Sequence, residues 1–418
     1  MDDNEKAEIL AKKMLKGEVK PHKISEAAGD ESIAAAARRK YIEKRYSTRL
    51  IHTAITSVDL DDANNRNIEN VIGVTQVPVG FAEILVNGEY ATKGAKRPVF
   101  LATTEGRLVA GVNRGAAAIN KSGGATTRIL KNGMTRSVLL ETKTVTASYA
   151  AAQFIKSNSG KALITKAFSE NTKYITLQDV EVYNTGRFLF VVYSADTSAA
   201  MGMNMLTIAS SDATRALIEN LAKKGLKLTL LSESGNMCAD KKPSMINVIR
   251  GRGISIVAEA TIPKKILKDC FKADAKKIEE LNHAKNYVGS SLAGSIAHNA
   301  HVANVLSAIF IAYGQDAAQV VDGVNALDDA KAQKNGDLYI SVYIPALEIG
   351  TYGGGTRRET QKELLSATGV YGEGDSKGIT KMKFAEIIAA TVLAGELNLL
   401  AAQAGMELSS SHASLKRG

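Results

Sequence analysis

Two lysines and a carboxylate stand side by side in the run Asp240-Lys241-Lys242. The pair Gly235-Asn236 precedes this run, and Pro243 fixes the backbone directly after it. Neighbouring lysines on a surface helix are usually only solvated. In a short rigid loop, by contrast, two ammonium groups can bind a multiply charged acid and stabilise a developing oxyanion. The run is therefore a candidate catalytic or binding loop.

Three other titratable side chains have positions suited to proton transfer. Glu105 follows a short apolar segment and precedes Gly106, where partial burial would keep a carboxyl protonated as a general acid. Asp316 comes just after Gly314, the residue predicted to end a helix. His412 follows three serines near the C-terminus, and a hinged histidine can deliver a proton near neutral pH. A solvated turn, a polar helix end and an exposed tail are the ordinary alternatives.

Two glycine-containing segments are candidate phosphate sites. The run Gly353-Gly354-Gly355-Thr356 would let backbone N–H groups approach a pyrophosphate, although such glycines also make ordinary tight turns. The segment 200–205 precedes a predicted helix whose N-terminus attracts anions, or else it is a methionine-rich part of the core. On the predicted helix 299–313, His301 and Asn304 share a face, which could equally be a polar stripe.

Composition narrows the classes of ligand. The chain has 418 residues and a formal net charge of +10, which favours an anionic partner. Aromatic residues are only 5% and tryptophan is absent, so a base-stacking platform for nucleic acid is not expected. Cys238 and Cys270 form no CxxC or zinc spacing, so neither a disulfide framework nor a structural metal is expected. There is no P-loop, and Gly251-Arg252-Gly253 lacks the third glycine of the common dinucleotide fingerprint.

The candidate residues lie between predicted helices and strands of a mixed α/β chain. Segments rich in alanine, lysine and glutamate predict a small helical region at 5–16 and 31–46. A strand-like pattern begins near 71–74, and a compact α/β unit is expected from about 136 to 231, in which Asp212 is the predicted N-cap of an amphipathic helix. The other predicted elements are strands at 187–193, 226–231, 254–260 and 338–344, and helices at 212–224, 299–313 and 383–408.

Neither end of the chain predicts an export or membrane segment. The first six residues are polar and acidic, unlike a signal peptide. The most apolar stretch, 384–406, carries Glu386, Glu396 and Asn398, which is typical of a buried helix and not of a membrane span. We therefore expect a cytoplasmic protein.

Many short motifs, in order from about Glu69 to His412, resemble those of one enzyme family. The family is class I hydroxymethylglutaryl-coenzyme A (HMG-CoA) reductase, in its soluble form without a membrane anchor. Each motif is weak alone, but more than ten in the same order are specific. They are Glu69 to Gly73, Pro78 to Gly80, Thr103 to Gly106, Asn113 to Gly115, Met134 to Arg136, Met201 to Met205, Gly235 to Pro243, Gly251 to Gly253, Asn299 to His301, Gly314 to Asp316, Glu348 to Thr356 and Ala394 to Leu397.

The resemblance implies a four-electron reduction of HMG-CoA to mevalonate and free coenzyme A, for isoprenoid synthesis. Two hydrides would come from two molecules of NADPH. Lys241 matches the residue that stabilises the oxyanion after each hydride arrives. Glu105 matches the proton donor to the aldehyde-level oxygen, and Asp316 matches the aspartate that holds and tunes both. His412 matches the histidine that protonates the departing thiolate.

The resemblance also implies two sets of binding residues. Four of the residues matched to substrate binding, Arg136, Ser234, Asp240 and Lys242, match positions that hold the carboxylate end of the substrate. Lys272 and Asn304 match further pocket positions, and Arg114 matches a coenzyme A contact. The whole set matched to substrate binding is Arg136, Ser234, Asn236, Asp240, Lys242, Lys272, Asn304 and Arg114. The set matched to NADPH binding is Lys173, Met201, Gly202, Met203, Asn204, Gly353, Gly354, Gly355 and Thr356.

Three positions depart from the family pattern or bear on its regulation. Ala199 stands where the family has an aspartate, so an acidic cofactor contact is lost and the choice between NADPH and NADH is open. Lys173 falls where the animal enzymes have an arginine near the 2′-phosphate, which favours NADPH. Gly418 stands where the animal enzymes carry a regulatory phosphoserine, so no such switch is expected.

The family fold implies an α/β (α+β) chain of three parts. These are a helical N-terminal region at 1–70, a large HMG-CoA-binding domain at 71–137 and 233–418 around a long central helix, and an inserted ferredoxin-like NADP-binding domain at 138–232. We expect a homodimer or dimer of dimers, a C-terminal flap that carries His412, no metal, and neither nucleic acid nor membrane as a partner. The alternative, which only Ala199 supports, is an impaired paralogue that binds coenzyme A esters or regulates a partner. Lys173 argues against an oxidative, NAD-linked enzyme.

Overall fold

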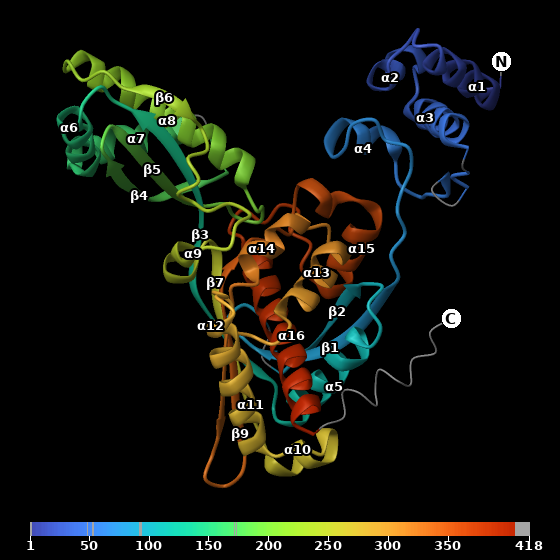
Figure 1. Ribbon diagram of the computed structural model, residues 1–418, viewed down its shortest axis with the longest axis vertical. Coiled ribbons are helices and arrows are strands. Elements are labelled where there is room, and N and C mark those ends of the chain that lie inside the picture. The colour runs from blue at the N-terminus through green and yellow to red at the C-terminus, as the bar shows by residue number, and fades with distance from the viewer. Residues whose placement is uncertain are drawn as a thin grey trace. The chain divides into compact units, whose positions relative to one another are not determined.

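Figure 1 shows a computed structural model of the chain, which describes residues 2–47, 49–51, 54–91, 94–170, 172 and 174–405, with residues 22 and 46 described by their backbone alone. The contacts divide the chain into two compact units. The first is Met1–Pro78 with Gly354–Glu363, and the second is Val79–Gly353 with Leu364–Gly418. The chemistry-bearing loops at Glu105, Lys241 and Asp316 all belong to the second unit.

The first unit is helical, as the sequence predicts. Its helices are α1 (Asp3–Leu15), α2 (Ile24–Ala28), α3 (Glu31–Tyr46) and α4 (Leu60–Arg66), with short 3-10 turns at η1 (Pro21–Lys23) and η5 (Gly354–Arg357). Asp30 caps α3 by accepting a hydrogen bond from the backbone N–H of Ile33 at 3.0 Å. A small apolar core joins α1, α2 and α3 and contains Ala7, Leu10, Met14, Ile24, Ala28, Ala34 and Ala37.

The strand predicted near 71–74 is wrong. Residues 71–78 are extended but belong to no strand. Buried Arg38 donates from Nη1 to the carbonyl oxygen of Val71 at 3.0 Å, and Arg39 donates to the carbonyl oxygen of Ile72. These carbonyls are therefore paired with arginine side chains of α3 in place of a neighbouring strand.

The second unit is built on a nine-stranded mixed sheet whose main order is β2-β1-β3-β7-β9-β8. The long strand β3 pairs with β7 over Thr126–Gly133 and with β5 over Met134–Glu141, so it runs through both parts of the sheet. The strands are β1 (Val79–Asn87), β2 (Lys96–Ala102), β3 (Ala125–Glu141), β4 (Thr176–Thr185), β5 (Phe188–Asp196), β6 (Thr229–Ser232), β7 (Gly253–Ile262), β8 (Leu327–Ala332) and β9 (Leu338–Leu347).

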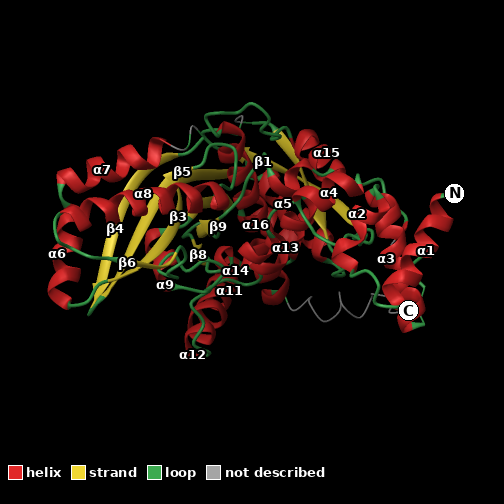
Figure 2. Cartoon of the chain, turned by 90° about the horizontal axis from the view of Figure 1, so that it is seen from above, coloured by secondary structure: helices red, strands yellow, loops and turns green. Residues whose placement is uncertain are grey.

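One part of the second unit has its own core. Helices α6 (Val145–Lys156), α7 (Asn158–Glu170) and α8 (Met203–Lys223) pack on one face of β3, β4 and β5 (Figure 2). Alternate residues of β3 and β5, such as Val138, Leu140, Val191 and Tyr193, enter this core. The compact α/β unit expected between about 136 and 231 is therefore present as a packed layer. The exact limits of an inserted domain remain a prediction.

The predicted cap at Asp212 is wrong, because α8 is longer than expected. This helix begins at Met203, directly after Gly202, whose φ of 85° only glycine adopts readily. Asp212 consequently lies inside the helix and pairs with Arg215 at 3.2 Å. The methionines, leucines and alanines of the first turns favour a helix as strongly as the residues that follow.

Helix α16 (Ile379–Ala404) is the central helix of the second unit (red in Figure 1). Most of its residues are buried, including polar ones such as Glu386 and Glu396, so its apolar composition reflects a place in the core. Its acidic side chains hold neighbouring loops: Glu386 accepts hydrogen bonds from the backbone N–H groups of Glu89, Tyr90 and Ala91.

The remaining helices are α5 (Leu108–Lys121), α9 (Met245–Arg250), α10 (Lys264–Phe271), α11 (Ala275–Leu281), the π-helical η3 (Asn282–Gly289), α12 (Ser290–Leu292), α13 (Val302–Ala312), η4 (Ala317–Gln319), α14 (Val320–Gly323) and α15 (Glu359–Thr368).

Candidate active site

The Lys241 loop, defined here as residues 235–243, connects β6 to α9. It is tied to the sheet where the N–H of Gly235 donates to the carbonyl oxygen of Ser137 at 2.8 Å. Three of its non-glycine residues have positive φ: Asn236 at 60°, Ala239 at 46° and Lys241 at 55°. Such conformations persist only where surrounding contacts fix them, and they cluster at functional sites. These three backbone conformations agree with the short rigid loop that the sequence predicts.

Lys241 and Asp316 form an ion pair, with Lys241 Nζ 2.7 Å from Asp316 Oδ2. Asp316 is itself oriented, because its Oδ1 accepts the N–H of Ala318 at 3.1 Å at the start of η4. The hydrogen bond with Asp316 raises the pKa of Lys241 above its ordinary value, and burial opposes this only in part. An ammonium that stays protonated and points to a fixed place can stabilise negative charge that develops on a substrate oxygen.

Asp240 and Arg136 meet beside this pair. Arg136 Nη1 lies 3.7 Å from Asp240 Oδ2, and Arg136 Nε donates to the carbonyl oxygen of Glu233 at 3.1 Å. Lys242 Nζ donates to the carbonyl oxygen of Asp240 at 3.0 Å. The structure thus brings together three residues that the resemblance assigns to substrate binding, because Arg136 and Lys242 both contact Asp240. Ser234 lies at the loop's start, where its N–H donates to Ser232 Oγ at 3.0 Å.

Glu105 is paired with Asn304, whose Nδ2 donates to Glu105 Oε1 at 3.2 Å. Glu105 lies between the end of β2 and the start of α5, and its N–H donates to Thr103 Oγ1 at 3.0 Å. Asn304 is in the first turn of α13, whereas Asp316 follows the end of that helix. A link from Asp316 to Glu105 remains a prediction.

His301 does not share a helix face with Asn304, because α13 begins only at Val302. His301 is the residue before the helix, with φ at −162°, and its Nε2 lies 2.8 Å from the carbonyl oxygen of Gly395 in α16. Glu396 accepts the backbone N–H of His301 at 2.9 Å. These contacts direct His301 to the central helix and leave Asn304 to contact Glu105.

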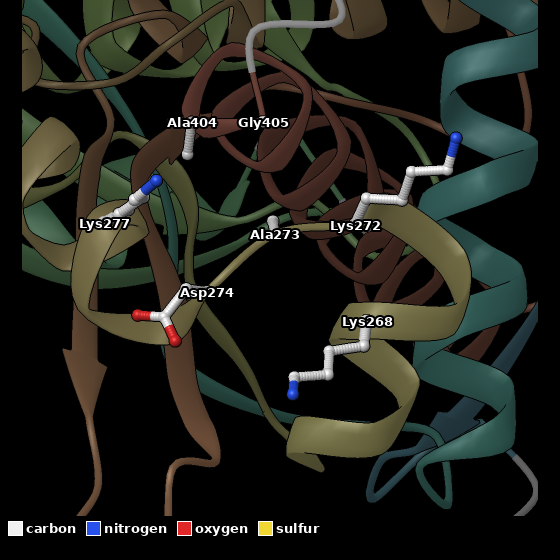
Figure 3. A pocket seen from close by; sticks show the side chains of 7 residues that line it. All are labelled: Lys268, Lys272, Ala273, Asp274, Lys277, Ala404 and Gly405. Carbon is white, nitrogen blue, oxygen red and sulfur yellow. The ribbon is translucent and has the colours of Figure 1, made fainter.

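Arg114 and Lys272 lie in a second basic region, beside the C-terminal end of α16. Arg114 Nε donates to Asn398 Oδ1 of α16 at 2.7 Å, and its guanidinium lies over the ring of Phe271, 5.2 Å from its centre. Lys272 follows Phe271 with φ at 52° and points toward α5 in Figure 3. It lines a pocket of about 440 Å³ whose lining also includes Lys268, Ala273, Asp274, Lys277, Ala404 and Gly405. This arrangement suits phosphate groups.

The family model described as hydroxymethylglutaryl-coenzyme A reductase matches residues 34–417 of the chain. The chain belongs to the hydroxymethylglutaryl-coenzyme A reductase family.

Full-length relatives agree with the family assignment. The chain is 43% identical to the 3-hydroxy-3-methylglutaryl-coenzyme A reductase of Pyrococcus abyssi over 412 residues, which are 98% of this chain and 99% of that protein. It is 44% identical to the enzyme of that name from Aeropyrum pernix, over 98% of this chain and 96% of that protein. The resemblance that the motifs indicate is thus confirmed.

Solved structures support the fold. A class II 3-hydroxy-3-methylglutaryl-CoA reductase from Streptococcus pneumoniae, solved with NADPH in open conformations, superposes with a TM-score of 0.64. The identity is 20%, and the match covers 87% of this chain and 92% of that chain. The mixed α/β architecture predicted from the sequence is therefore confirmed.

In this member of the HMG-CoA reductase family, the turn 197–202 has the features of a cofactor site. It leads into the N-terminus of α8, where Gly202 at φ 85° offers no side-chain cap. The N–H of Thr351 donates to the carbonyl oxygen of Ala199 at 2.8 Å, so the chain after β9 lies against the turn. A Cβ at Gly350 would come within 2.6 Å of the backbone nitrogen of Met201, so this contact needs glycine. An uncapped helix N-terminus can attract an anion, and binding of the cofactor at this turn remains a prediction.

Lys381 lies under the same turn and was not singled out from the sequence. Its Nζ donates to Thr197 Oγ1 at 3.0 Å and to the carbonyl oxygen of Ala200 at 3.4 Å. Burial lowers the pKa of Lys381 to about 8, although Asp196 and Asp375 favour the charged form. The signal available in the sequence was a lysine within the apolar start of α16.

Two of the predicted site residues lie outside the described part of the chain, and the glycines of the predicted cofactor site are shared between the two units. Lys173 and His412 lie outside the described residues, so their roles remain predictions. Gly354, Gly355 and Thr356 belong to the first unit, while Gly353 belongs to the second. Three further residues, Arg252, Asp322 and Glu348, are buried near the Lys241 loop, and the sequence alone assigns none of them a role. Arg252 and Glu348 lie in the motifs Gly251 to Gly253 and Glu348 to Thr356, and the glycines that flank Arg252 have φ values of 71° and 70°.

Proposed function

We propose that Lys241, held by Asp316, stabilises the oxyanion in the reduction of HMG-CoA to mevalonate and coenzyme A. The single observation that carries this proposal is the 2.7 Å contact between Lys241 Nζ and Asp316 Oδ2 on a loop of fixed conformation. NADPH supplies one hydride in each of two steps, so one thioester and two NADPH yield one alcohol and one thiol.

The pKa of Lys241 decides what it can contribute. Lys241 is protonated at neutral pH, and Asp316 raises its pKa further, so that it presents a positive charge to the carbonyl oxygen of the substrate. As a C–O double bond becomes single, that oxygen gains negative charge and its attraction to the ammonium grows. An interaction that is stronger in the transition state than in the ground state accelerates the reaction.

Proton delivery is proposed for two other residues. Glu105, which Asn304 holds at 3.2 Å, donates a proton to the aldehyde-level oxygen. His412 donates a proton to the sulfur of coenzyme A as the carbon–sulfur bond breaks. The proton lets coenzyme A leave as a neutral thiol, which is a better leaving group than the thiolate.

Each of the two basic regions binds a different part of the substrate. Arg136 and Lys242 receive the free carboxylate of the hydroxymethylglutaryl group, with Asp240, Ser234 and Asn236 completing that end. Arg114 and Lys272 receive the phosphates of coenzyme A. The pocket beside Lys272 has two further lysines, and this surplus of positive charge supports the second assignment.

NADPH binding is proposed for the turn 201–204 and for the glycines 353–355 with Thr356, and Lys173 is proposed to meet the 2′-phosphate. Ala199 does not remove the site, because its backbone carbonyl still fixes the turn through Thr351. We further propose a cytoplasmic homodimer that needs no metal and binds neither nucleic acid nor membrane.

The test is a stoichiometric assay of the full chain with HMG-CoA. NADPH oxidation and free thiol are measured together, with Lys241→Ala as the control. Two NADPH oxidised per thiol released, with loss of both signals in the variant, would support the proposal. A folded protein that turns over with neither NADPH nor NADH would contradict it and would favour a paralogue that binds coenzyme A esters.

A further inference from the structure

Asp322 is a fully buried carboxylate beneath the Lys241 loop. Its Oδ2 accepts the backbone N–H of Lys241 at 2.9 Å, and its Oδ1 accepts the backbone N–H of Lys242 at 3.3 Å. Asn247 Nδ2 lies 3.4 Å from Asp322 Oδ1 and 3.3 Å from the carbonyl oxygen of Ala239. One carboxylate therefore binds the backbone N–H groups of both lysines.

The loop needs such an acceptor because of its own backbone. Ala239 and Lys241 both have left-handed φ values, 46° and 55°, which residues with a Cβ rarely adopt. The N–H groups of Lys241 and Lys242 both donate to the carboxylate of Asp322, which is fully buried although the two lysines are exposed residues. A buried N–H without an acceptor is strongly unfavourable, so the carboxylate stabilises this loop shape over others.

Arg252 keeps the carboxylate in place. Its guanidinium is fully buried, with Nη1 3.2 Å from Asp322 Oδ2 and Nη2 3.1 Å from Asp240 Oδ1, and it also contacts Glu348. The three carboxylates have oxygens within 4.8 Å of one another, a spacing that calls for a cation between them. In this chain the cation is Arg252, so Asp322 below the loop and Asp240 on the loop share one rigid counter-charge.

We infer that Asp322 is a positioning residue, which holds the backbone of Lys241 so that its ammonium reaches Asp316 and the reacting oxygen. The inference rests on the proposed function, in which Lys241 acts on that oxygen. The ion pair with Asp316 fixes only the far end of a flexible side chain. Asp322 fixes the near end, and the two contacts together define where the ammonium lies.

Asp322→Asn tests this inference, because it keeps the shape but replaces one acceptor oxygen by a donor. A small displacement of a catalytic group can cost about a hundredfold in rate, and we expect a fall in kcat of that order. The basic limb of the pH–rate profile should also move to lower pH, because Lys241 would lose contact with Asp316. A role in stability alone would not move that limb.

Glu386→Gln is the matched control. Glu386 is an equally buried carboxylate that accepts backbone N–H groups, but those of Glu89, Tyr90 and Ala91, in a different loop. Thermal unfolding of both variants is measured so that rates refer to folded protein. If Asp322→Asn stays within about threefold of Glu386→Gln in kcat, with an unchanged pH profile, the inference is overturned.

Hydrogen exchange on the unaltered chain gives a result even if the variant does not fold. The amides of Lys241 and Lys242 should exchange slowly, although they lie in a loop, because both bond to buried Asp322. Fast exchange of both would overturn the inference. A slow-exchanging loop in a chain that does not reduce HMG-CoA would instead contradict the proposed function and leave the structural role of Asp322 intact.

Discussion

Lys241 and Asp316 are joined by an ion pair of 2.7 Å, although 75 positions separate them in the sequence numbering, 316 − 241. The contact connects the loop after β6 with the turn after α13. Both side chains are only partly exposed, at 42% and 33%. The pair is therefore accessible to a substrate, and its geometry is set by two separate elements of the fold.

Asp316→Asn should lower the pKa of Lys241, because the hydrogen bond with Asp316 is the largest cause of its elevation. The basic limb of the pH–rate profile of kcat should then move to lower pH. Loss of an oriented electrostatic partner should also reduce kcat by about a hundredfold. Glu279→Gln, which breaks the exposed pair of Glu279 with Lys331, is the control and should change neither quantity. A normal pH profile in Asp316→Asn would refute this assignment.

Glu105→Gln should reduce kcat by at least about a hundredfold, because an amide cannot donate the proton that the aldehyde-level oxygen needs. KM should change little, since glutamine can keep the contact with Asn304. Steady-state kinetics with HMG-CoA separate the two effects. An unchanged kcat together with a raised KM would make Glu105 a binding residue only.

Lys272→Ala should raise KM for HMG-CoA by about tenfold and leave kcat nearly unchanged, as expected for the loss of one charged contact to phosphate. The effect should shrink at high salt, because screening weakens the contact in the wild type. Lys334→Ala, in the turn between β8 and β9, is the control for net charge. An equal KM in the two variants would argue against a phosphate role for Lys272.

The lowered pKa of Lys381 should make the free energy of unfolding depend on pH. Burial lowers its folded pKa to about 8, while 10.5 applies to the unfolded chain. Between these values the unfolded state binds more protons than the folded state, so the contribution of Lys381 to stability rises with pH. Below pH 8 both states are charged, and the full cost of burying the ammonium, about 3 kcal/mol, is present.

Lys381→Met removes this titration, so it isolates the effect from that of other lysines and tyrosines. Urea unfolding of both proteins from pH 7 to pH 10.5 is the measurement. The free energy of unfolding of the wild type should rise relative to the variant across this range. A constant difference would mean that Lys381 does not titrate in this window.

The candidate site can be recognised in the sequence where its residues are close together. The Lys241 loop, with its glycine, carboxylate, lysines and proline, lies within ten residues. The cluster of Arg252, Asp322 and Glu348 cannot be recognised in this way, because Arg252 and Asp322 are 70 residues apart and Asp322 lies in no motif. Only the antiparallel pairing of β7 with β9, and the position of α14, bring these three side chains together.

Two predicted elements failed for related reasons. Val71 and Ile72 have the composition of a strand, but Arg38 and Arg39 of α3 occupy their carbonyls. Asp212 is a good N-cap by residue type, yet Gly202 begins the helix earlier. In each case the secondary structure was decided by residues outside the segment in question. The preferences of the segment's own residues do not contain that information.

If Lys241 stabilises the oxyanion in both reduction steps, its loss should slow each of them. This is measured as the rate of NADPH oxidation by wild type and Lys241→Ala, first with HMG-CoA and then with the aldehyde-level intermediate supplied alone. Both rates should fall by at least about a hundredfold in the variant. Reduction of the aldehyde at the wild-type rate would contradict this role of Lys241.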